Sequence, residues 1–76
     1  DMLYAIITTQ KAGEVGINHS LHRKSSDGTL IIINENDLKN NRSIQGSTPQ
    51  ERAAYLEGTL YTLHQLNNEI QEGGWL

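Results

Sequence analysis

Apolar and polar residues follow different patterns along this chain, and each pattern predicts one kind of element. Residues 2–9 (MLYAIITT) form a nearly continuous run of apolar residues and β-formers, which predicts a strand with little polar face. Residues 15–24 alternate between apolar and polar with a period of two, which predicts a half-buried antiparallel strand. Residues 29–34 (TLIIIN) are again almost all β-branched or Leu, and they predict a third strand.

The segments between these strands carry turn signals. Gly13 and Gly16 predict a flexible turn after the first strand. Asp27-Gly28 predicts a tight hairpin between the second and third strands, because such a reversal needs positive φ angles. The Asn-rich segment 34–41 favours local side-chain hydrogen bonds, so we expect a turn or one short helical turn there.

The last third of the chain has the features of one long amphipathic helix. Thr48 is a suitable N-cap, Pro49 suits the first helical position and Glu51 completes a capping box. Gly73-Gly74 provides a C-terminal cap, and no proline interrupts the residues between. We therefore predict a single helix over about 49–72. Its apolar face consists of Ala53, Leu56, Leu60, Leu63, Leu66 and Ile70.

Together these elements predict an α+β fold in one small domain, residues 1–76. The expected architecture is β-β-β-α. A three-stranded antiparallel β-meander, with strands at about 2–9, 15–24 and 29–34, is followed by one long C-terminal α-helix packed on one face of the sheet. The sequence leaves open which face the helix covers.

The predicted helix is longer than the sheet that it covers. A helix of this length spans about 36 Å, whereas a seven-residue strand spans about 23 Å. Apolar residues of its C-terminal half would therefore extend beyond the sheet, and an exposed apolar patch usually meets a partner. We expect a homodimer through this half of the helix, or contact with another protein chain; the alternative is that loops 10–16 and 34–47 cap the overhang. The candidate self-association residues are Leu63, Leu66, Asn67, Ile70 and Trp75.

Composition narrows the possible functions. A chain of 76 residues buries only roughly 60–65 % of its surface on folding, so a second subunit would add needed stability. Cysteine is absent, which excludes disulfides, thiolate metal sites and cysteine nucleophiles. The apolar run at 2–7 is too short for a membrane span or a signal sequence. We expect a soluble cytoplasmic protein that does not associate with membranes.

Residues that could carry chemistry do not form a recognisable site. His19 and His22 would leave opposite faces of the predicted strand, and adding His64 still gives a weak set of metal ligands. The Ser and Thr residues lack a nucleophile motif, and residues 13–16 lack the lysine of a phosphate loop. We therefore expect no catalytic residue, no cofactor and no metal, and a protein that is not an enzyme.

The hairpin tip suggests an alternative function. His22, Arg23 and Lys24 stand beside several hydroxyl groups on a two-stranded ribbon, which could enter a DNA groove. The net charge of −3 arises entirely within residues 47–76, which leaves a local basic patch possible in the rest of the chain. In topology alone, the predicted fold resembles the sheet-reading DNA-binding domains of plant transcription factors and some phage integrases. The alternative hypothesis is therefore a nucleic-acid-binding or regulatory protein that uses this hairpin.

Overall fold

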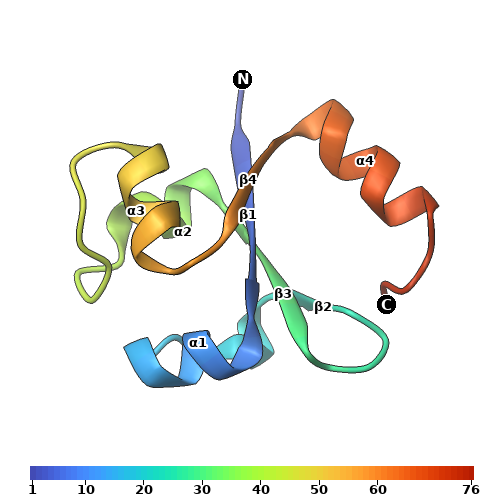
Figure 1. The fold of residues 1–76 in the computed structure, drawn as a ribbon, viewed down its shortest axis with the longest axis horizontal. Coiled ribbons are helices and arrows are strands. Elements are labelled where there is room, and N and C mark those ends of the chain that lie inside the picture. Colours follow the sequence, from blue (N-terminus) through green and yellow to red (C-terminus); the bar gives the residue numbers. More distant parts are fainter.

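The computed structural model describes residues 1–76 and contains a four-stranded antiparallel sheet, in the order β2-β3-β1-β4, flanked by helices (Figure 1). The α+β class is confirmed, whereas the numbers of strands and helices differ from the prediction. In chain order the elements are β1 (Leu3–Thr8), α1 (Thr9–Val15), the 3-10 helix η1 (His19–Leu21), β2 (Arg23–Lys24), β3 (Leu30–Asn34), α2 (Glu35–Asn40), α3 (Pro49–Tyr55), β4 (Thr59–Thr62) and α4 (Leu63–Gln71).

The strand β1 lies at the centre of the sheet. It pairs with β3 on one side, where Ile7 is opposite Ile31, and with β4 on the other, where Ala5 is opposite Leu60. The predicted strands at 2–9 and 29–34 are thus confirmed as β1 and β3. Their uniformly apolar composition has a structural reason, because both faces of these strands are covered by other elements.

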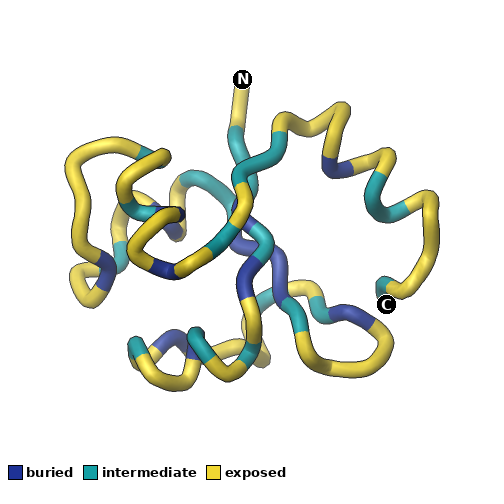
Figure 2. Tube along the Cα trace, viewed as in Figure 1, coloured by how far each residue is buried: buried dark blue, intermediate teal, exposed yellow.

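The main core lies between one face of the sheet and the helices α1, α2 and α3. Alternate residues of β1 and β3 point to this face, as the pleat of a strand requires. Figure 2 shows the buried positions gathered along these two strands, with single buried positions on the surrounding segments. The buried residues of this core are Ala5, Ile7, Ala12, Ile17, Ile31, Ile33, Leu38, Ile44, Ala53 and Leu56.

The prediction of a strand over 15–24 is wrong, because cap residues form the helix α1 before it. The Thr8 hydroxyl accepts a hydrogen bond from the Lys11 backbone N–H at 3.0 Å, and Gly16 ends the helix with a φ of 90°. The 3-10 helix η1 follows, so only Arg23–Lys24 remain as β2. The hairpin at Asp27-Gly28 is confirmed, since β2 and β3 pair directly across it and Gly28 has a φ of 75°.

The prediction of one helix over 49–72 is also wrong. Its start is confirmed, since the Thr48 hydroxyl accepts from the Glu51 N–H at 3.1 Å, but α3 ends at Tyr55. The next residues, Thr59–Thr62, pair with β1 as β4. A second capping box then starts α4, in which the Thr62 hydroxyl accepts from the Gln65 N–H and the Gln65 side chain accepts from the Thr62 N–H.

Gly58 allows the chain to cross closely over β1 between α3 and β4. A Cβ atom at this position would lie 2.6 Å from Ile7 Cγ2 and 2.9 Å from the Ile6 carbonyl oxygen. The preceding residue, Glu57, has a positive φ of 56°, so the helical path is broken here. β-branched and aromatic residues beyond Gly58 then gain more by pairing with β1 than by continuing a helix.

The Arg52 side chain joins α3 to the end of α2 and to the loop between them. Its guanidinium donates hydrogen bonds to four backbone carbonyls, of Leu38, Lys39, Asn41 and Gly46, at 2.7 to 3.0 Å. Because a buried or half-buried carbonyl without a donor costs free energy, this one side chain stabilises a loop that has no regular structure.

The second face of the sheet is covered by α4 and the C-terminal residues. Leu66 is 5 % exposed and Ile32, on β3, is 8 % exposed. The C-terminal segment runs along the outer edge of β2: Trp75 forms an antiparallel bridge with Ser25, and the Leu76 N–H donates to the Lys24 carbonyl at 3.1 Å. A smaller apolar layer therefore lies between α4 and the sheet.

Replacing Gly58 by Ala should destabilise the protein by about 1–3 kcal/mol, because the new methyl group would overlap Ile7 and the β1 backbone. Urea unfolding followed by circular dichroism measures the loss. The matched control is Gly13→Ala in α1, where nothing lies within 4 Å of the new atom. That change should be neutral or stabilising by up to about 1 kcal/mol. Equal effects of the two substitutions would contradict the close crossing at Gly58.

Replacing Arg52 by Lys should destabilise the protein by roughly 2–3 kcal/mol, because an ammonium group cannot reach carbonyls that lie in several directions. The exposed Arg42 provides the control, and Arg42→Lys should change the free energy of unfolding by less than about 0.5 kcal/mol. Chemical denaturation compares the two variants. A mild effect of Arg52→Lys would mean that charge alone, and not the fork of donors, holds the loop.

Candidate interaction groove

The residues predicted for self-association do not form one exposed surface in the structure. α4 has only nine residues, so the long overhanging helix from which the prediction was argued is absent. Leu66 is buried against the sheet, and Ile70 and Trp75 are half-buried. Leu63, which is 53 % exposed, and Asn67 remain on the surface. Self-association through these residues stays a prediction.

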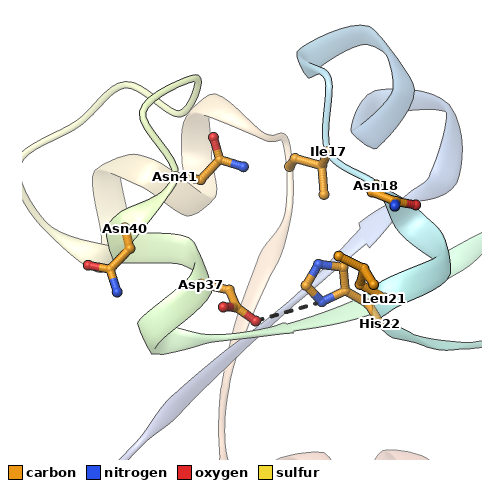
Figure 3. Close-up of a pocket in the computed structure, with 7 residues that line it drawn as sticks. All are labelled: Ile17, Asn18, Leu21, His22, Asp37, Asn40 and Asn41. Atoms are coloured by element: carbon orange, nitrogen blue, oxygen red, sulfur yellow. Dashed lines mark ion pairs between the residues drawn. The ribbon is translucent and has the colours of Figure 1, made fainter.

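Two adjoining hollows lie beside η1 and α2, and each has a volume of about 300 Å³. They share Leu21, His22 and Asp37, so we treat them as one feature, the α4–η1 groove. The hollow between η1 and α2, drawn in Figure 3, is lined by Ile17, Asn18, Leu21, His22, Asp37, Asn40 and Asn41. The hollow between α4 and the sheet is lined by Tyr4, Leu21, His22, Arg23, Ile32, Asn34, Asp37, Leu66 and Ile70.

A histidine and an aspartate face each other where the two hollows meet (Figure 3). His22 Nδ1 lies 3.9 Å from Asp37 Oδ2, and the His22 side chain is only 12 % exposed. Asp37 belongs to the first turn of α2, whose N-cap Asn34 accepts a hydrogen bond from the Asp37 N–H at 2.9 Å. A His–Asp pair can move a proton, but no Ser, Thr, Cys or Lys lines the groove to act as a nucleophile.

Asparagine side chains give the η1–α2 hollow hydrogen-bond donors. The Asn18 side-chain oxygen accepts from the Ser20 N–H and hydroxyl, and the Asn41 oxygen accepts from the Ser43 N–H at 2.8 Å. Because these bonds fix the oxygens, the amide nitrogens are free to donate to another group. Figure 3 shows Asn18, Asn40 and Asn41 placed around the His22–Asp37 pair.

The hollow between α4 and the sheet is mainly apolar, and an exposed leucine stands beside it. Leu21 lines both hollows and is nevertheless 77 % exposed. The neighbouring floor and wall consist of apolar side chains from β1, β3 and α4, namely Tyr4, Ile32, Leu66 and Ile70. A protruding apolar side chain and an apolar hollow are therefore part of the same surface.

The basic residues of the hairpin do not act together in the structure. Arg23 and His22 line the groove, and Arg23 Nε donates to the Leu76 carbonyl at 2.6 Å. Lys24 does not line the groove and follows Arg23 on the same strand, so it points to the other face. Elsewhere Lys11 is paired with Glu57 at 3.0 Å, and this hydrogen bond raises the pKa of Lys11. Nucleic-acid binding by the hairpin stays a prediction.

The hairpin tip itself is organised around one carboxylate. Asp27 Oδ1 accepts hydrogen bonds from the Thr29 N–H at 3.0 Å and from the hydroxyls of Ser25 and Thr29, each at 2.8 Å. The bond from the Thr29 backbone and those from the two hydroxyls favour the charged form, so the pKa of Asp27 is lowered from its ordinary value of 3.8. The tip is therefore a folded turn with a negative centre.

No group of three or more His, Asp or Glu side chains is placed to hold a metal ion. None of the helices combines the length and the apolar character needed to cross a lipid bilayer. Comparison of the chain with protein-family models, with curated proteins and with solved structures finds no match.

Part of this groove could be predicted from the sequence, and part could not. His22, Arg23, Leu66 and Ile70 were candidate residues, although for two separate surfaces, and the structure brings them together. Leu21 and Asp37 were missed, because η1 and α2 come together only in the folded chain. The sequence did contain a signal for α2. Asn34 is a suitable N-cap, and Asp37, three residues later, is an acidic residue of the kind that is favoured in the first turn of a helix.

Replacing Asp27 by Ala should lower the stability of the protein at neutral pH, because three donors in the hairpin turn lose their acceptor. The folded-state pKa lies below 3.8, so the stabilisation is present above that value and is lost as the pH falls through the folded pKa. The difference between the two proteins in thermal unfolding should therefore narrow below pH 3.8. A difference that is the same at all pH values would contradict a role for the charge.

Proposed function

We propose that the protein is a non-enzymatic interaction module that self-associates as a twofold dimer through the α4–η1 groove. The observation that carries this proposal is the position of Leu21, an exposed leucine directly beside an apolar hollow. A twofold interface uses the same surface on both subunits, so the surface must contain both the protruding group and the cavity that receives it. Leu21 of each copy would enter the hollow between α4 and the sheet of the other.

The charges around this surface also suit a second copy. Arg23 and Asp37 both line the hollow and carry opposite charges. In a twofold arrangement, a surface with one cation and one anion can place each of them near the opposite charge of the partner. Such complementarity fixes the orientation of the two subunits more than it adds affinity.

The size of the chain gives self-association a physical benefit. A 76-residue domain without disulfides buries little apolar area, and a second subunit adds to it. A specific interface needs about 500 Å² or more from each partner, which is roughly a tenth of the 4802 Å² surface of this chain. Beside the groove, Leu76 is also highly exposed and its carbonyl is bonded to Arg23, so it can extend the apolar contact.

This proposal keeps the dimer predicted from the sequence but changes its surface. Leu66 and Ile70 contribute through the wall of the hollow, whereas Leu63 and Asn67 do not line it. The apolar hollow and the asparagine donors of the groove support a binding role, and the lack of cysteine fits a reducing compartment such as the cytoplasm.

Replacing Leu21 by Asp should weaken the dimer at least about tenfold in Kd, because it places a charge in an apolar hollow of the partner. Leu21 is so exposed that the substitution leaves the fold of each subunit intact, which circular dichroism verifies. Sedimentation velocity over a range of protein concentrations measures the dissociation.

Leu63→Asp is the matched control, since Leu63 is an exposed leucine on α4 outside the groove. It should leave the dimer unchanged. A dimer broken by Leu63→Asp and not by Leu21→Asp would assign the interface to the outer part of α4 instead. A wild-type protein that stays monomeric at the highest concentration measured would overturn the proposal.

A further inference from the structure

A separate hollow lies on another side of α4, between this helix, the hairpin tip and the C-terminal residues. Its volume is about 380 Å³. Two aromatic side chains, Tyr61 and Trp75, and two carboxylates, Asp27 and Glu69, are among its lining residues, whereas Lys, Arg and His are not. Its chemistry therefore differs from that of the α4–η1 groove, which contains His22 and Arg23.

The tryptophan is held in position by the backbone on both sides of it. The Ser26 N–H donates to the Gly74 carbonyl at 2.8 Å, and the Leu76 N–H donates to the Lys24 carbonyl at 3.1 Å. Trp75 itself bridges to Ser25 and is half-buried. The backbone of Trp75 is thus held at the wall of the hollow, although Trp75 directly follows the two glycines after α4.

The negative charge in this hollow has no cation to balance it. Neither Asp27 nor Glu69 takes part in an ion pair. Hydrogen bonds from Thr29 and Ser25 lower the pKa of Asp27 and keep it ionised at neutral pH. Burial, together with the negative charge of Glu69, raises the pKa of Tyr61, so the phenol stays neutral beside a carboxylate.

We propose that this hollow binds an alkylammonium group. The faces of Trp and Tyr rings attract cations, and carboxylates supply the opposite charge. Ile6 and Leu30, which also line the hollow, offer apolar contact to the alkyl part. No group of three or more His, Asp or Glu side chains is placed to hold a metal ion, and the unpaired negative charge favours a cation over a neutral ligand. The group can come from a small quaternary ammonium compound or from a lysine side chain of another protein.

Trp75 is the only tryptophan in the chain, so its fluorescence reports directly on this hollow. The protein is titrated with choline and, in a second arm, with a short lysine-containing peptide, at constant ionic strength. The neutral control is 3,3-dimethyl-1-butanol, which has the shape of choline without its charge. A saturable change in fluorescence with either cation, and none with the alcohol, is the expected result.

The two arms identify the source of the cation. A response to choline alone assigns a free quaternary ammonium compound, and a response to the peptide alone assigns a lysine side chain. A response to both assigns the hollow to alkylammonium groups of either source. No saturable response to either cation, or an equal response to the alcohol, would overturn the proposal.

Glu69→Gln should weaken this binding at least about fivefold, because it removes one of the two charges. Glu72→Gln is the matched control; Glu72 is near the same end of α4 but does not line the hollow, so the affinity should be unchanged. Leu21→Asp should also bind the cation normally, because Leu21 does not line this hollow. Loss of dimerisation and loss of cation binding are therefore distinguishable results.

Discussion

The rest of the structure depends on the central position of β1. This strand is paired on both sides and covered on both faces, so every layer of the protein contacts it. Its neighbour β4 can reach it only because Gly58 leaves room for the chain against Ile7 and the Ile6 carbonyl. β4 is followed directly by α4, which lies on the face of the sheet opposite α3. Gly58 therefore permits the close crossing through which the chain passes from α3 to β4.

The two faces of the sheet are covered unequally, and this inequality creates the candidate sites. Three helices close the main core, with Leu38, Ile44, Ala53 and Leu56 among its buried residues. A single nine-residue helix and a short C-terminal segment cover the other face. One helix is about 10 Å wide, about the distance between three neighbouring strands, so it cannot cover four strands. Hollows therefore remain beside α4, and their chemistry is set by the loops that border each one.

The sequence predicted the fold correctly where a segment fitted only one type of secondary structure, and incorrectly where it fitted two. β1, β3, the hairpin and the start of α3 each combine composition with one turn or cap signal, and the structure confirms them. The stretch after Thr48 had two compatible patterns: a helical apolar stripe, and a short β-rich segment between Gly58 and the capping box of Thr62 and Gln65. The stripe extends through both helices, so periodicity alone could not locate the break. The break depends on contact with β1, which is far away in the sequence.

The candidate surfaces were harder to predict than the fold, because each is assembled from separate elements. The alternation at 15–24 placed Ile17 and Leu21 on the same face of a strand, whereas in the structure Ile17 is buried and Leu21 is exposed. A helical turn at η1 separates their directions, and it also brings His22 to Asp37 of α2. On the other side of α4, the hairpin tip and the C-terminal segment bring Asp27 and Trp75 to one hollow. α4 thus separates a surface that contains His22 and Arg23 from one whose only charged residues are Asp27 and Glu69, so the two surfaces differ in charge.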